Sequence, residues 1–176
     1  MLKHIYLNIV LKWLAYCMLF GAAITHADNS EYQVKAAFLY NLARMVEWPN
    51  ENPSAPLVMC FMGEDVFGNT TEGIATKTIR NRPIVFRKNV TLQSVEICHI
   101  LYISSSERSN ITSISKALAT RAILTVGDIE DFTERGGMVN LIRDNERIKI
   151  EVNLKRAEKT GLKISSRLLT LAKIVQ

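Results

Sequence analysis

Apolar residues recur along the chain in two rhythms, one typical of strands and one typical of helices. Six short runs are either continuously apolar or alternate between apolar and polar residues, as buried and half-buried strands do. Ile148, Ile150 and Val152 alternate with charged residues, so we expect this strand to bury only one face. The predicted strands cover residues 57–62, 83–87, 97–103, 122–126, 138–142 and 147–152, and the last two form an antiparallel hairpin.

Helical spacing separates most of these strands. Ser30 is a suitable N-cap for a helix that extends to about residue 46, where Pro49 follows. Its buried stripe would hold Val34, Ala37, Phe38, Asn41, Leu42 and Met45, which follow the i, i+3, i+4 spacing. Further helices are predicted near residues 63–73, from Asn110, from Gly127-Asp128 to Gly136, from Asn153 to Gly161, and from Ser165 or Ser166 through Leu168, Leu169, Ala172 and Ile174 or Val175.

Strands that alternate with helices and end in a hairpin predict the fold class. We expect an α/β fold in a single domain, with a mixed sheet of about six strands flanked by helices on both faces. In open sheets of this class, ligands bind beyond the carboxyl ends of the parallel strands. The loops expected there include Gly63-Glu64-Asp65, Gly127-Asp128 and a serine rim formed by Ser104, Ser105 and Ser106.

The first 27 residues differ from the rest of the chain. Lys3 and Lys12 precede a 12-residue apolar run, and Thr25-His26-Ala27 then places small residues at the −3 and −1 positions of a cleavage point. A membrane-spanning helix needs about 20 apolar residues, so this run is short for an anchor. We predict a cleaved signal peptide at residues 1–27 and an exported domain at residues 28–176.

Charge and residue types exclude several classes of function. The chain has 22 Lys and Arg against 17 Asp and Glu; without Lys3 and Lys12 the net charge is only +3, with no basic cluster typical of nucleic-acid binding. His99 is the only histidine after residue 27, and neither a nucleophile elbow nor a phosphate-binding glycine motif is present. Two cysteines and one histidine do not supply a usual zinc site. We therefore predict no catalytic residue, metal or cofactor.

Two sets of residues are candidates for structural and binding roles. Cys60 and Cys98 each lie in an apolar strand-like run, so in an oxidising compartment we expect one disulfide, the alternative being two buried thiols. A bridge of this span could add roughly 4 kcal/mol of stability. Acidic residues at Glu64-Asp65 and Asp128-Glu130-Asp131 could bind a cation, but they lie at predicted helix starts, where carboxylates are favoured anyway.

A partner surface is the most specific binding prediction. Trp48 and Phe67 follow predicted elements in loops, and Arg147, Glu151 and Asn153 share the polar face of one strand. Aromatic and arginine side chains are frequent in interface hot spots. Ordinary packing of the two aromatic rings and a solvated charged row are the alternatives.

Several stretches together resemble a known family. They are residues 31–41, Val46-Glu-Trp-Pro49, Gly63 to Gly68, residues 124–128, 136–140 and 147–153, and residues 161–169, which include Arg167. In this order they resemble the YfiR-like family of periplasmic proteins. The resemblance implies a non-catalytic protein, often dimeric, that binds the periplasmic part of an inner-membrane diguanylate cyclase and represses it, until an outer-membrane lipoprotein relieves the repression.

The resemblance also carries over to individual residues. Cys60 and Cys98 match one cysteine pair of the family, whereas Thr133 and Asn140 stand near the positions of a second pair. Glu151 is the residue that the resemblance marks for repression, and Arg167 joins the predicted partner-binding set. A different class of function stays open, namely a periplasmic small-ligand receptor or enzyme that uses the serine rim.

Overall fold

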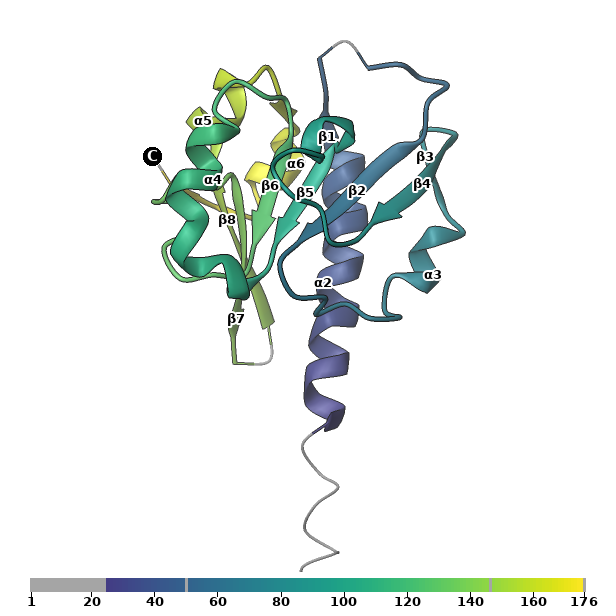
Figure 1. The fold of residues 1–176 in the computed structure, drawn as a ribbon, viewed down its shortest axis with the longest axis vertical. Helices are drawn as coiled ribbons and strands as arrows, with labels where there is room; N and C mark the ends of the chain where they lie inside the picture. Colours follow the sequence, from purple (N-terminus) through teal and green to yellow (C-terminus); the bar gives the residue numbers. More distant parts are fainter. Residues whose placement is uncertain (1–24, 50, 146, 176) are drawn as a thin grey trace, which may run out of the picture.

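The computed structural model describes residues 25–49, 51–145 and 147–175 (Figure 1). The predicted signal peptide lies outside the described residues except for its last three positions, which begin helix α2 (Thr25–Met45). None of the helices in the described part of the chain is long and apolar enough to cross a membrane.

The centre of the fold is a mixed eight-stranded sheet in the order β10-β8-β7-β6-β5-β2-β4-β3. Strands β4, β2, β5, β6 and β7 run parallel, β8 is antiparallel to β7, and β10 is parallel to β8. The mixed sheet and the hairpin are confirmed. The strands are β2 (Leu57–Met62), β3 (Thr78–Ile79), β4 (Arg82–Arg87), β5 (Ile100–Ile103), β6 (Leu124–Gly127), β7 (Val139–Asp144), β8 (Arg147–Asn153) and β10 (Lys173–Val175).

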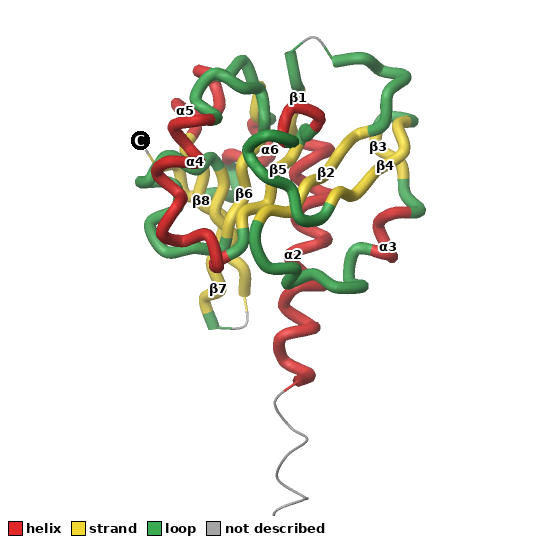
Figure 2. Tube along the Cα trace, in the orientation of Figure 1, coloured by secondary structure: helices red, strands yellow, loops and turns green. Residues whose placement is uncertain are grey.

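Helices cover both faces of this sheet, as Figure 2 shows. One core packs α2 against alternate strand residues such as Met59, Ile100 and Val126, and the other packs α4 against Leu101 and its neighbours. A small second sheet pairs β1 (Val46–Glu47) with β9 (Lys163–Ile164). The remaining elements are α3 (Glu72–Ala75), α4 (Ile111–Ala117), α5 (Leu154–Lys159), α6 (Ser166–Leu169) and two 3-10 helices, η1 (Val95–Ile97) and η2 (Ser105–Asn110).

The face of α2 that contacts the sheet differs from the predicted one. Of the predicted stripe, Leu42 is buried and Phe38 and Met45 pack against the core, but Val34 is 47% exposed and Ala37 and Asn41 face solvent. The other buried positions are Ala36, Leu39 and Ala43. The helix carries two overlapping apolar stripes that both satisfy the i, i+3, i+4 spacing, so the spacing alone does not select between them. The stripe with Leu39 and two alanines contacts the sheet.

Two predicted helices are wrong. Residues 130–136 form successive turns. Asn140 holds the start of this loop, since its Oδ1 accepts from the N–H of Ile129 at 3.2 Å and its Nδ2 donates to the carbonyl of Ile129 at 2.7 Å. The last helix ends at Leu169, and residues 173–175 form β10 instead. By pairing with β8, residues 173–175 satisfy backbone groups on the edge of β8 that would stay unpaired if these residues formed a helix.

The predicted disulfide between Cys60 and Cys98 is present, with the two Cα atoms 5.8 Å apart. Cys60 lies in β2, and Cys98 lies just before the neighbouring strand β5. Both residues belong to the core under α4. The bond therefore joins β2 to the segment that leads into β5, inside the protein.

Candidate functional site

A pocket of about 620 Å³ opens at the carboxyl end of β6, between α2, the following loop and strands β7, β8 and β10. We call it the acidic pocket, because its charged lining holds more carboxylates than cations. The cations are Lys35, Arg143 and Lys173. The carboxylates are Glu31, Asp128, Glu130, Asp131, Glu134 and Glu151.

A buried lysine lies at the centre of this pocket. Lys35 is only 2% exposed, and its Nζ lies 2.6 Å from Oδ2 of Asp128 and 2.5 Å from Oε1 of Glu31. The hydroxyl of Tyr32 also donates to Asp128, at 3.3 Å. A buried ammonium group is stable only when it is paired, so the two carboxylates and the lysine depend on one another.

Two further ion pairs line the pocket, one that connects this centre to β7 and one that joins β10 to β8. Arg143 of β7 donates from Nη1 to Oε2 of Glu31 at 2.7 Å, and Lys173 of β10 donates to Oε1 of Glu151 at 2.9 Å. Burial acts to raise the pKa of Glu31, but hydrogen bonds and charges from Lys35 and Arg143 outweigh it and hold that pKa below its ordinary value. The hydrogen bond from Lys173 to Glu151 raises the pKa of Lys173.

Aromatic rings support the pocket from the core. Tyr32 packs edge-on against Phe67 with 5.3 Å between ring centroids, and Phe67 packs edge-on against Tyr102 at 4.7 Å. Burial, and then the charge of Asp128, raise the pKa of Tyr102, which therefore stays neutral at physiological pH. Tyr32 therefore joins the ionic centre to this aromatic cluster.

Trp48 and Phe67, which were predicted to be exposed, are both buried. Trp48 is 8% exposed, and its indole N–H donates to the carbonyl of His99 at 3.0 Å. Phe67 is 1% exposed. Both rings extend inward because each has core aromatic or histidine neighbours to pack against. Whether either residue affects partner binding stays a prediction.

The predicted charged row is only partly brought into the pocket. Glu151 lines the pocket, while Arg147 is exposed in the β7–β8 hairpin. Asn153 is used within the chain: its Oδ1 accepts from the N–H of Arg156 at 2.9 Å and its Nδ2 donates to the carbonyl of Thr133 at 3.0 Å. Arg167 is exposed on α6 and does not line the pocket. Partner contacts by these residues stay predictions.

The serine rim lies beside a second, shallower pocket of about 430 Å³ that Gly63 and Glu107 help to line. Ser104 is buried and its Oγ accepts from the N–H of Ser106, whose own Oγ accepts from the N–H of Glu64 at 2.9 Å. Ser105 and Ser106 are exposed. Two of the three predicted ligand hydroxyls therefore hold the loops together, and ligand binding at the rim stays a prediction.

His99 also serves packing. Its Nδ1 accepts from the N–H of Val58 at 3.1 Å, and its Nε2 lies 3.0 Å from Nη2 of the buried Arg82, which pairs with Glu51. Burial first, and the charge of Arg82 second, lower the pKa of His99 to about 4. Across the described residues, no group of His, Cys, Asp and Glu side chains is arranged to hold a metal ion.

All three cations of the pocket, Lys35, Arg143 and Lys173, were missed from the sequence, as were Glu31, Tyr32 and Glu134. Lys35 did give a signal, because it interrupts the apolar side of a helix four residues after Glu31. Arg143 and Lys173 gave none, since they reach the pocket only through the order of the strands.

Comparison with known proteins confirms the family resemblance of the sequence. A model of the YfiR/HmsC-like family matches residues 32–173, which span the pocket from Tyr32 to Lys173. A comparison with curated proteins finds no match. Because the family model covers most of the sequence, including strands β2 to β8 of the sheet, the chain belongs to the YfiR/HmsC-like family.

Proposed function

We propose that this chain is a non-catalytic periplasmic regulator that binds the periplasmic part of an inner-membrane diguanylate cyclase and represses it. Repression lowers cyclic di-GMP and biofilm formation. Family membership supports the regulatory role. The observation that carries the proposal is the place of Glu151, the residue expected to matter for repression, in the wall of the acidic pocket.

The pocket is suited to recognition by charge. Its side chains are held by internal ion pairs before any partner arrives, so binding needs little ordering of the site. Six carboxylates against three cations give a net negative lining. A partner surface with complementary basic groups would be favoured there, and like-charged surfaces would be rejected.

Repression follows from differential affinity. A regulator that binds the inactive cyclase more tightly than the active one shifts the equilibrium toward inactivity. To reduce an evenly balanced cyclase to about 1% activity, the difference must be roughly 100-fold, near 2.7 kcal/mol. A few charged contacts at the centre of an interface can supply this difference.

The test is genetic. Deletion of the gene should raise cyclic di-GMP, measured by mass spectrometry, and Glu151→Lys should do the same while the purified variant stays folded by circular dichroism. Glu158→Lys is the matched control, because Glu158 is exposed on α5 and does not line the pocket. An unchanged cyclic di-GMP level in the deletion strain would reject the proposal.

A second copy of the chain and an outer-membrane lipoprotein that relieves repression are further partners in this proposal. The pocket of about 430 Å³ beside the serine rim supports one other candidate, a periplasmic small-ligand receptor or enzyme. A small molecule that co-purifies with the protein and is lost on Ser105→Trp would favour that candidate.

A further inference from the structure

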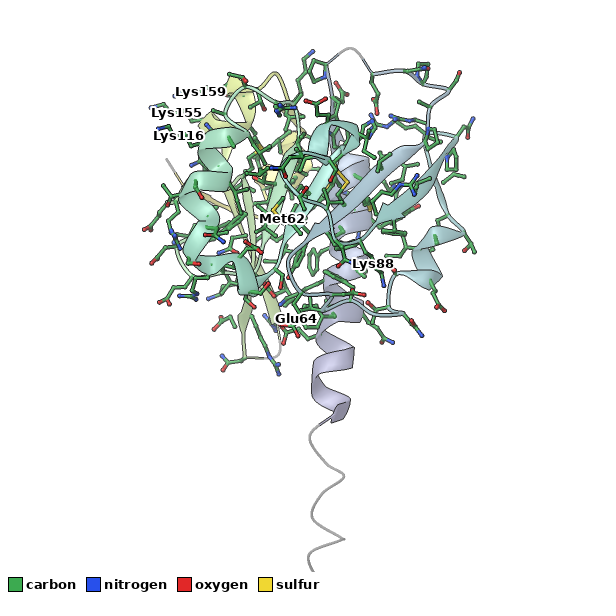
Figure 3. The ribbon with its side chains drawn as sticks, viewed as in Figure 1. Met62, Glu64, Lys88, Lys116, Lys155 and Lys159 are labelled. Atoms are coloured by element: carbon green, nitrogen blue, oxygen red, sulfur yellow. A yellow bond between two sulfur atoms is a disulfide. The ribbon has the colours of Figure 1, made fainter. Side chains whose placement is uncertain are left out.

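Three lysines lie close together at one end of the molecule. Lys116 lies in the last turn of α4, and Lys155 and Lys159 lie on α5. The two helices touch here, because the guanidinium of Arg156 donates to the carbonyl of Ser115. Figure 3 shows the three lysines side by side, with Glu64 near the opposite end. We call Lys116, Lys155 and Lys159 the lysine patch.

Topology places the lysine patch away from the acidic pocket. Helix α4 runs back from the carboxyl end of β5 to the amino end of β6, and α5 follows β8, which is antiparallel to its neighbour β7. Both helices therefore present the patch at the amino end of the parallel strands. The acidic pocket lies beyond the carboxyl end of β6, so the two kinds of charge are separated along the strand direction.

The charge of the patch is not neutralised within the described part of the chain. All three lysines are exposed, and the ion pairs found among the described residues involve other cations, such as Lys35, Lys149 and Lys173. Helix α5 contains three basic residues and one carboxylate, Glu158. The patch therefore attracts anions from outside the chain.

The form of the patch favours a diffuse anionic surface over a protein partner. The exposed large apolar residues lie outside α4 and α5, so the patch has no apolar anchor of the kind that dominates protein interfaces. Lysine acts as a point charge on a flexible stem and, unlike arginine, does not recognise one group in a fixed bidentate geometry. These properties suit phosphate groups spread over a lipid surface.

We propose that the lysine patch binds the anionic phospholipid headgroups of a membrane surface. Bound in this way, the protein lies with α4 and α5 toward the lipid and with the acidic pocket directed away from it. Each lysine near an anionic bilayer raises the partition coefficient by about fivefold, so the three together contribute roughly 100-fold. This inference does not depend on the proposed function, because either candidate function allows it.

The test uses residues 25–176, which contain every described element, and sedimentation with vesicles. We expect binding to vesicles that contain phosphatidylglycerol and phosphatidylcholine, weak binding to phosphatidylcholine alone, and loss of binding as added salt shortens the Debye length. Lys116→Gln, Lys155→Gln and Lys159→Gln combined should reduce the partition coefficient by roughly 100-fold. The matched control combines Lys77→Gln, Arg87→Gln and Arg147→Gln, which removes the same charge from exposed positions outside α4 and α5.

The outcomes separate the possibilities. Retained binding by the control and loss by the patch variant support the proposal, provided that both have the circular dichroism spectrum of the wild type. Equal losses in the two variants overturn it, because net charge alone would then explain binding. No preference for phosphatidylglycerol also overturns it, and binding of the patch to an acidic protein in its place would assign the surface to a protein partner.

Discussion

Lys35→Met is the sharpest test of the ionic centre in the acidic pocket. The substitution keeps the length and most of the volume of the side chain but removes its charge. Asp128 and Glu31, whose side chains are 8% and 16% exposed, then lose the cation that lies within 2.6 Å of both. Arg143 still pairs with Glu31 but leaves Asp128 without a cation among its described contacts.

The expected loss follows from the burial of these groups. Removal of one partner from a buried ion pair costs about 3–5 kcal/mol, because a charge is left without compensation in a medium that solvates it poorly. The loss should depend on pH. The wild-type pKa of Glu31 is depressed from 4.5, so its contribution is fully present above that pH and is lost as the pH falls through the lower, folded-state pKa. In the Lys35→Met variant the pKa of Glu31 is depressed less. The difference in the free energy of unfolding between wild type and variant should therefore shrink as the pH falls.

Urea unfolding measures this difference directly. The midpoint should fall while the slope stays unchanged, which reports a change in stability without a change in exposed surface. Lys149→Met is the control, because Lys149 is 67% exposed and its pair with Asp144 should contribute less than about 1 kcal/mol. Asp128→Asn should restore part of the stability in the Lys35→Met background. If Lys35→Met costs no more than Lys149→Met, the reasoning about the buried centre is wrong.

Two other predictions concern the scaffold around the pocket. A Cβ at Gly137 would overlap the ring of Phe132, so Gly137→Ala should lower the free energy of unfolding by about 1–3 kcal/mol. Gly73→Ala is the control, because a Cβ at Gly73 meets nothing within 4 Å and the substitution should be neutral or stabilising. Equal effects of the two substitutions in thermal unfolding would contradict this prediction. Reduction of the disulfide between Cys60 and Cys98, which closes a separation of 38 residues, should cost roughly 4 kcal/mol, and an unchanged urea midpoint with reductant would count against it.

The fold was predictable where local pattern and tertiary packing agree. The continuous apolar runs gave β2 and β5, which are covered on both faces, and the alternation of Ile150 and Val152 with charged residues gave the half-buried strand β8. Short edge strands such as β3 and β10 have only two or three residues, which is too few for a period to show. Their conformation comes from the neighbour to which they hydrogen bond.

The candidate site was less predictable for a related reason. Glu151 was reached through family resemblance. Lys35 contradicts the usual preference of lysine for solvent, and its burial is explained by two carboxylates: Glu31, one helical turn away, and Asp128, which is distant in sequence but adjacent in space. Trp48 and Phe67 were misplaced because a large ring in a loop is equally compatible with an interface and with a core. The choice depends on neighbours that come from other parts of the chain.

The ion pair between Glu31 and Arg143 joins residues that are 112 positions apart, and Lys173 reaches Glu151 from the last strand described. During synthesis, the wall of the pocket is therefore completed after all the other elements have been made. A nascent or partly folded chain offers no such surface. Under the proposed function, a partner that recognises the pocket would thus respond only to chains that have finished folding.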